Sequence, residues 1–286
     1  MFRHATRAFS PLARHHAPRP HTLKQAALSA RRYATAPDDG PAVTATNRAE
    51  ATLKRFWKDV GIEKRDGGYA VTLDRRALKT PGGRPLVVPA EKRLVAALVA
   101  SEWENQTTVL KPHALPMTSI ASRALDAFED EGTRAEIRAQ LLKYFGTDTV
   151  CYHADAPATL VKLQAEHWQP ILDWAVSMLG IDIAVSTSFA VPKQSPETIA
   201  KLDEILKGFS SWEMAAMERA TYTSKSFLVG LALVMGRIDV DQAAQAAHVE
   251  VNSQIERWGE VEDSHDVDFH DIRRQLGSAS CLLADY

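Results

Sequence analysis

The sequence predicts an α+β fold, in which a small β-containing N-terminal domain precedes a larger, mostly α-helical C-terminal domain. The clearest β-strand pattern lies early, in Gly67–Pro89. Beyond it, apolar residues recur mainly at spacings of three and four, which is the period of an amphipathic helix. From Pro196 onward the whole chain has this helical pattern. We therefore expect an N-terminal α+β domain at residues 54–155 and a helical domain at residues 156–286.

The first 37 residues differ from the rest of the chain. They contain seven Lys or Arg and no Asp or Glu, together with Ser and Thr but no long apolar core. This composition is typical of a mitochondrial presequence, and a disordered basic tail is the alternative. We expect a targeting presequence at residues 1–34, with a processing site in Arg31–Thr35, followed by a linker at residues 35–53. The expected location is the mitochondrial matrix.

The charge balance limits the class of partner. Removing the seven basic residues of the leader from the total of 34 leaves 27, against 36 acidic residues, which gives a net charge of −9. An acidic protein binds nucleic acid poorly, because phosphate contacts require a basic face. We expect a neutral or basic protein partner and no nucleic acid. The two cysteines, Cys151 and Cys281, form no CxxC motif and indicate neither a disulfide scaffold nor a zinc site.

Neither a membrane segment nor a cofactor motif is found in the sequence. The most apolar run, Phe227–Gly236, is half the length of a spanning helix, so we expect a buried core helix and no stable membrane insertion. The dinucleotide, P-loop, GxSxG and HExxH motifs are all missing. We therefore expect no cofactor.

The β region begins with an alternating strand. Tyr69, Val71 and Leu73 alternate with smaller or polar residues, which predicts a half-buried strand. Thr80–Gly83 has the Pro and Gly of a turn, and Leu86–Val88 is expected to form the returning strand.

Helices are expected next. The first follows Pro89, with Val95, Val99 and Trp103 on one stripe, the second follows Pro116, and the third follows Thr133. Short strands are expected at Asp148–His153 and Ile181–Ser186, and between them a helix over Thr159–Leu179 that is broken at Gln169–Pro170. A helix is expected from Pro196, followed by one or two helices over Trp212–Met235. The last two expected helices are one that starts at Asp239 or Asp241 and ends at Gly259, and one that runs through Ile272 and Leu276.

The helix that ends at Gly259 presents two kinds of face. Its predicted core stripe consists of Ala244, Ala247, Val251, Ile255 and Trp258. A neighbouring face carries Glu250, Gln254 and Arg257 at spacings of four and three. This face is either an ordinary exposed surface or a binding surface.

The following carboxylate-rich stretch is the best candidate for a metal site. Glu262, Asp266 and His270 are each four residues apart, so they lie on one stripe of a helix. Phe269, Ile272 and Leu276 are expected to form the buried side of the same helix. An acidic stripe opposite an apolar one is also what any surface helix shows, so a solvated or partner-facing surface is favoured over a metal site.

Five segments cover most of residues 54–268 in order: KRFWKDVGIEKRDGGYAVTLDRRALKTPGGRPLVVP, ALVASEWENQ, LPMTSIASRALD, GTDTVCYHADAPATLVKLQAEHWQPILDWA and VEVNSQIERWGEVEDSHDVD. Together they resemble the mitochondrial assembly chaperones for the alpha subunit of the F-type ATP synthase. The resemblance implies a β-containing N-terminal domain followed by a helical domain.

The resemblance also implies a function that is not enzymatic. Such a chaperone binds the unassembled alpha subunit, prevents its aggregation and delivers it to the alpha/beta hexamer. The expected form is a monomer. The alternative function is a metal-dependent matrix enzyme that uses Glu262, Asp266 and His270.

Two positions in the matching segments are singled out. Glu250 matches a family position in the EVxxQIxRWG helix, and we expect it to be essential for function. Trp103, in SEWENQ, matches another, for which a structural role in the core is expected. The further residues predicted to bind the partner are Gln254, Arg257, Trp258, Glu260 and Glu262.

Overall fold

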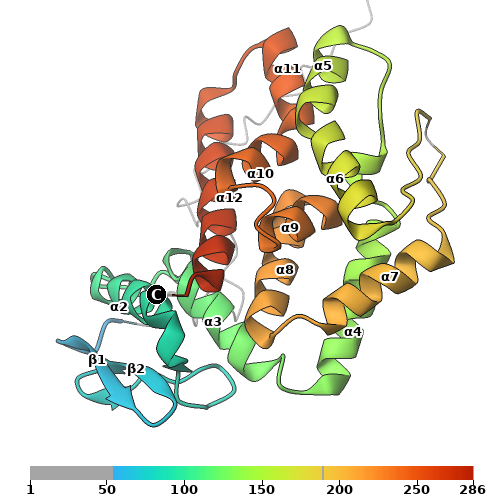
Figure 1. Cartoon of the computed structure of the whole chain (residues 1–286). Coiled ribbons are helices and arrows are strands. Elements are labelled where there is room, and N and C mark those ends of the chain that lie inside the picture. Colours follow the sequence, from blue (N-terminus) through green and yellow to red (C-terminus); the bar gives the residue numbers. More distant parts are fainter. Residues whose placement is uncertain (1–53, 189, 286) are drawn as a thin grey trace, which may run out of the picture. The chain divides into compact units, whose positions relative to one another are not determined.

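The computed structural model describes residues 54–188 and 190–285 (Figure 1). The predicted presequence and linker, residues 1–34 and 35–53, lie outside these residues and stay predictions. A small antiparallel sheet comes first in the chain, and helices make up most of the rest. The predicted α+β fold class, with the sheet near the N-terminus, is therefore confirmed. The domain boundary near residue 155 stays a prediction.

The sheet is built around one central strand. β2 (Gly68–Leu73) pairs with β1 (Val60–Arg65) along its whole length, from Val60 opposite Leu73 to Arg65 opposite Gly68. β3 (Arg76–Ala77) and β4 (Val87–Val88) also pair with β2, each over two residues. The returning strand was predicted. β1 was not, because its apolar alternation is limited to Val60 and Ile62 before three charged residues follow, and none of its residues is buried.

β2 is more deeply buried than its alternation predicted. Ala70 and Thr72, expected on a solvent face, are as buried as Val71 and Leu73. Neighbouring strands flank β2, and α2 (Arg93–Glu104) packs against it, so little of the strand reaches solvent. Gly68 is required at the start of β2, because its φ is +147° and a Cβ there would lie 1.9 Å from the carbonyl oxygen of Val88.

The three helices expected after Pro89, Pro116 and Thr133 are present. They are α2, α3 (Pro116–Asp126) and α4 (Glu131–Phe145), the last starting three residues earlier than expected because Asp130 caps it. The predicted break at Gln169–Pro170 falls at Trp168, between α5 (Ala158–His167) and α6 (Gln169–Leu179). The remaining helices are α7 (Pro196–Lys207), α8 (Ser211–Ser224), α9 (Phe227–Val234), α10 (Val240–Ala247), α11 (Val249–Trp258) and α12 (Glu262–Leu283).

The single helix predicted to end at Gly259 is two helices. Asp239 caps α10, as expected, but the chain turns at His248 before α11 begins. The buried ring of His248 bonds to Asp268 of α12, with Nε2 and Oδ2 2.9 Å apart. The change of direction lets α10 pack against α8, α9 and α12, whereas α11 packs against α5.

The two short strands predicted after α4 and α6 do not form. Residues Thr149–Cys151 are a 3₁₀ turn, and the stretch from Ile181 meets Tyr152 only through an isolated bridge at Ser186. The cause is the buried carboxylate of Asp148, which accepts hydrogen bonds from the backbone N–H groups of Val150 and Leu228 and so holds a turn. A capping acid overrode the β-propensity of the local sequence.

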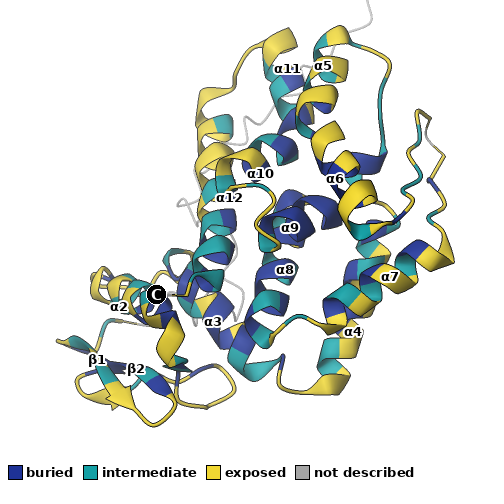
Figure 2. Cartoon of the chain, viewed as in Figure 1, coloured by how far each residue is buried: buried dark blue, intermediate teal, exposed yellow. Residues whose placement is uncertain are grey.

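α8 lies at the centre of the helical packing and contacts α3, α9 and α12. α9 is dark blue in Figure 2 because all of its residues except Val234 are buried. The apolar run Phe227–Gly236 thus contains a buried core helix, as predicted. No helix in the described part of the chain combines the length and the apolar character needed to cross a bilayer.

Candidate functional site

The residues predicted to bind a partner lie on α11 and at the start of α12. Glu250 is on the first turn of α11, and Gln254, Arg257 and Trp258 follow it along the helix. All six predicted side chains are exposed, and the same region is largely yellow in Figure 2. We call this set the α11–α12 surface: Glu250, Gln254, Arg257, Trp258, Glu260 and Glu262.

Two aromatic residues lie on the outside, although the sequence pattern placed them in the core. Trp258 is 70% exposed and Phe269 is 45% exposed. Each ring faces a guanidinium group. The guanidinium of Arg257 lies 5.0 Å from the centroid of the Trp258 ring, and that of Arg273 lies 3.5 Å from the centroid of the Phe269 ring. The reason is that α11 packs mainly against α5, whereas Trp258 is in its last turn. The core prediction holds for Ile272 and Leu276, which are buried.

The α11–α12 surface joins apolar side chains to strong negative charge. Val261 and Val267 are also exposed there, at 62% and 69%. Between Gln254 and Asp271 the chain has seven acidic residues, and Arg257 is its one Lys or Arg. An exposed apolar patch with a polar rim is a feature of protein-interaction surfaces.

The geometry gives no support to a metal centre on this surface. Glu262, Asp266 and His270 are exposed side chains in the first turns of α12. Within residues 54–188 and 190–285, no group of three or more His, Cys, Asp or Glu side chains is arranged to hold a metal ion. The neighbouring His265 uses Nδ1 to accept a hydrogen bond from the backbone N–H of Val261 at 2.9 Å.

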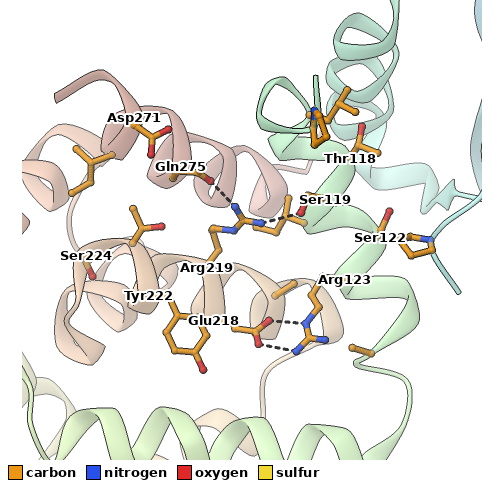
Figure 3. Close-up of a pocket in the computed structure, with 18 of the residues that line it drawn as sticks. Thr118, Ser119, Ser122, Arg123, Glu218, Arg219, Tyr222, Ser224, Asp271 and Gln275 are labelled. Atoms are coloured by element: carbon orange, nitrogen blue, oxygen red, sulfur yellow. Dashed lines mark hydrogen bonds and ion pairs between the residues drawn. The ribbon is translucent and has the colours of Figure 1, made fainter. Parts of the chain in front are cut away.

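A large groove adjoins this surface. It has a volume of about 1370 Å³ and is lined by α3, α8 and α12 and by the turn at Lys79–Gly82. We call it the α3–α8–α12 groove, and Figure 3 shows the side chains that project into it. Small-molecule sites are usually ~300–1,000 Å³, so this groove has room for a polypeptide segment.

Two arginines organise the groove. Arg123 of α3 forms a two-point ion pair with Glu218 of α8, with both N···O distances 2.8 Å (Figure 3). This hydrogen-bonded carboxylate raises the pKa of Arg123. Arg219 instead donates to two neutral acceptors, Gln275 of α12 at 2.6 Å and Ser119 of α3 at 3.1 Å. Partial burial lowers the pKa of Arg219, although the charges of Glu218 and Asp271 oppose that shift.

The groove and the α11–α12 surface meet at one junction. His248, Val251 and Asp268 line one part of the groove, and Val251 is one residue after Glu250 on α11. The bond from His248 to Asp268 fixes the start of α11 against α12 at this junction.

Sequence patterns did not reveal the groove. Arg123 and Glu218 are 95 residues apart, and Arg219 and Ser119 are 100 apart. On their own helices these residues look like ordinary polar positions. Only the packing of α3, α8 and α12 brings them together.

Trp103 lies at the other margin of the groove and is packed against the core. Its ring centroid is 4.9 Å from that of Trp57, and its indole N–H donates to the Thr118 hydroxyl at 3.0 Å. The adjacent Glu102 accepts from the backbone N–H groups of Met117 and Thr118, at the start of α3. Burial raises the pKa of Glu102, and these hydrogen bonds oppose the shift. Trp103 and Glu102 together fix the start of α3 to α2.

Comparisons with known proteins agree over most of the chain. Residues 54–176 match the model of the ATP12 chaperone protein family. The chain is 31% identical to the mitochondrial protein atp12 of Schizosaccharomyces pombe, over 82% of this chain and 83% of that protein. It is 30% identical to the mitochondrial protein ATP12 of Saccharomyces cerevisiae, over 83% and 86%.

A solved structure has the same fold. The crystal structure of Atp12 from Paracoccus denitrificans superposes with a TM-score of 0.69 at 33% identity, and the match covers 81% of this chain and 97% of that one. The family model covers the sheet and the helices up to α6, and the curated relatives and the solved structure match over about four fifths of the chain. The chain belongs to the ATP12 chaperone family.

Proposed function

We propose that this chain is a mitochondrial matrix chaperone for the unassembled alpha subunit of the F-type ATP synthase. It prevents aggregation of the free subunit and delivers it to assembly of the alpha/beta hexamer. The observation that carries the proposal is family membership over most of the chain, with relatives that are named as mitochondrial proteins. The Arg-rich, acid-free leader supports the same compartment.

The α11–α12 surface fits the physical task of such a chaperone. An unassembled subunit exposes the apolar face that later meets its neighbour, and this face promotes aggregation. A surface with exposed Trp258, Val261 and Val267 can cover apolar groups, whereas its carboxylates keep the free chaperone soluble. Replacement of one interface by another releases the client without a nucleotide-driven step.

The test is co-expression of the alpha subunit with the mature chaperone, with soluble alpha subunit and its co-purification as readouts. The wild-type protein is expected to keep the alpha subunit soluble and to co-purify with it. Glu250→Lys is expected to fold normally, because the side chain is exposed, and to lose most of the captured subunit. Trp258→Ser should do the same, because its ring lies outside the core.

The matched control is Glu136→Lys, which makes the same charge change at an exposed site on α4. It should capture the alpha subunit as the wild type does. If the wild-type protein neither protects nor binds the alpha subunit, the proposed client is wrong. If both the wild-type protein and Glu250→Lys capture the alpha subunit, the proposed client is right, but the α11–α12 surface is not where it binds.

A further inference from the structure

We propose that the α3–α8–α12 groove binds an acidic segment of polypeptide, with client carboxylates paired to Lys79, Arg219 and Lys225. The inference rests on the proposed chaperone function and names the chemistry of the client segment that the groove takes. The groove has the volume for such a segment and connects to the α11–α12 surface through His248 and Asp268.

The carboxylates that line the groove all accept hydrogen bonds from other residues of the chain. Glu218 pairs with Arg123, Asp268 with His248, and Asp271 with Arg274. Asp126 accepts from the Thr80 hydroxyl at 2.6 Å and from the backbone N–H of Gly82 at 2.8 Å. Asp126 therefore also has its hydrogen-bond partners within the described part of the chain.

Among the described residues, three positively charged side chains of the groove have no partner of opposite charge in direct contact. In the described part of the chain, Lys79, Arg219 and Lys225 line the groove and none of them forms an ion pair with a carboxylate. Arg219 is held in place by two neutral acceptors and has no direct ion pair with a described residue, although the nearby carboxylates of Glu218 and Asp271 favour its charged form. The donors left for an occupant are therefore cationic, which is uncommon on a protein whose net charge is −9 without its leader.

Charge also argues against the protein's own N-terminal segment as the occupant. Residues 1–37 carry seven positive charges and no negative charge. In the groove, these residues would bring Lys and Arg side chains next to Lys79, Arg219 and Lys225, and the like charges would repel one another. A client segment that combines carboxylates with apolar side chains fits both the cations and the apolar lining, to which Leu115, Ile120 and Ile272 contribute.

The experiment uses fluorescein-labelled 15-residue peptides that tile the alpha-subunit sequence, titrated against the full chain. Each acidic peptide is paired with a version in which every Asp and Glu is replaced by Asn or Gln. Acidic peptides should bind, and their amide versions should bind about tenfold more weakly. High salt should weaken the binding of the acidic peptides by a similar factor, because it screens the charge pairs. Competition with inorganic phosphate and ATP checks whether any anion suffices.

Variants locate the binding. The double variant Lys79→Gln/Lys225→Asn should bind acidic peptides about tenfold more weakly than the wild type and should bind amide peptides with unchanged affinity. It should fold, because Lys79 is exposed and Lys225 has a left-handed φ of 58° that Asn tolerates. Arg219→Gln should act in the same direction. Lys143→Gln/Lys162→Gln removes two exposed charges outside the groove and should have no effect.

A photo-crosslinker provides a direct readout of contact. Benzoylphenylalanine in place of Tyr222, which is 43% exposed in the groove, should crosslink to the acidic peptides. The same group in place of Met178, which is 72% exposed on α6, should not. Crosslinks from position 222 to residues 1–53 of the same chain would show that the chain fills its own groove and would overturn the proposal.

The outcomes separate this inference from the proposed function. If acidic peptides bind through the groove but the intact alpha subunit is not captured, the groove inference stands and the client is wrong. If the alpha subunit is captured but the groove variants bind every peptide as the wild type does, the groove inference is wrong and the client stands. Phosphate that competes as well as an acidic peptide would reduce the site to a general anion site, and equal binding of acidic and amide peptides would show that the client carboxylates play no part. Either result also overturns the proposal.

Discussion

Trp103 is fixed by a ring contact and a hydrogen bond, and both connect α2 to other elements. The ring packs against that of Trp57 at a tilted angle, and the indole N–H donates to the Thr118 hydroxyl at the start of α3. Trp103→Arg removes both contacts and places a charge against the core, so we expect a loss of roughly 3 kcal/mol or more in the free energy of unfolding. Trp103→Phe keeps the ring and should cost roughly 1 kcal/mol. Urea unfolding measures both.

Client capture by Trp103→Phe completes that test. If the role of Trp103 is structural, the folded Trp103→Phe variant should capture the alpha subunit as the wild type does. A Phe variant that unfolds like the wild type but fails to bind the alpha subunit would instead make Trp103 a contact residue of the groove.

Asp148 predicts a pH dependence of stability. Burial raises the pKa of its carboxyl from 3.8 to about 6, more than the hydrogen bonds from Leu228, Ser226 and Val150 lower it. Between pH 4 and 6 the folded state therefore binds more protons at this site than the unfolded state. The contribution of Asp148 to the free energy of unfolding should fall as pH rises through this window and stay constant above it.

Comparison with Asp148→Asn isolates this contribution from those of other carboxyls. The Asn amide turns one acceptor into a donor opposite a backbone N–H, so the variant should be about 1–3 kcal/mol less stable. The penalty should be largest near pH 4 and smaller at pH 7, as measured by urea unfolding at each pH. A penalty that grows with pH would contradict the raised pKa.

At the scale of the element, α8 and α9 depend on one close approach. A Cβ on Gly230 would lie 2.8 Å from the Thr221 hydroxyl oxygen and 3.0 Å from the Thr221 backbone nitrogen. Gly230→Ala should therefore force the two helices apart and lower the free energy of unfolding by about 1–3 kcal/mol. Gly277→Ala in α12 is the matched control, because its nearest neighbour is 4.0 Å away.

The control should be neutral or stabilising, by up to about 1 kcal/mol, because Ala favours a helix more than Gly does. Thermal unfolding of both variants tests the pair. Equal effects of the two substitutions would mean that the approach of α8 to α9 is not a constraint.

At the scale of the whole molecule, one continuous core predicts cooperative unfolding. Buried residues from the sheet to α12 belong to a single cluster, and Lys92 near the sheet pairs with Asp285 at the end of the described chain. We expect one urea transition, with tryptophan fluorescence and far-UV circular dichroism coincident.

Single-tryptophan variants sharpen this test, because Trp57 and Trp168 report from the two predicted domains. Their midpoints should agree. Separate midpoints for the two tryptophans would show that residues 54–155 and 156–286 unfold independently.

The sequence by itself determined the fold class, most of the helices and the family. Helical periodicity is local, so α3 and the break before α6 could be predicted from neighbouring residues. The predicted exposure of Glu250, Gln254 and Arg257 is confirmed for a similarly local reason, since they share the polar face of α11.

Tertiary structure decided the features that depend on distant residues. Asp148 makes a turn where propensity predicted a strand, because its carboxylate reaches Leu228 on α9. Trp258 matches a core stripe in the sequence, yet no helix among the described residues covers it, and its side chain is exposed. The α3–α8–α12 groove has no local signal, because Ser119, Arg219 and Gln275 meet only when three helices pack. Patterns along one helix set which side chains share a face, but only packing decides what that face meets.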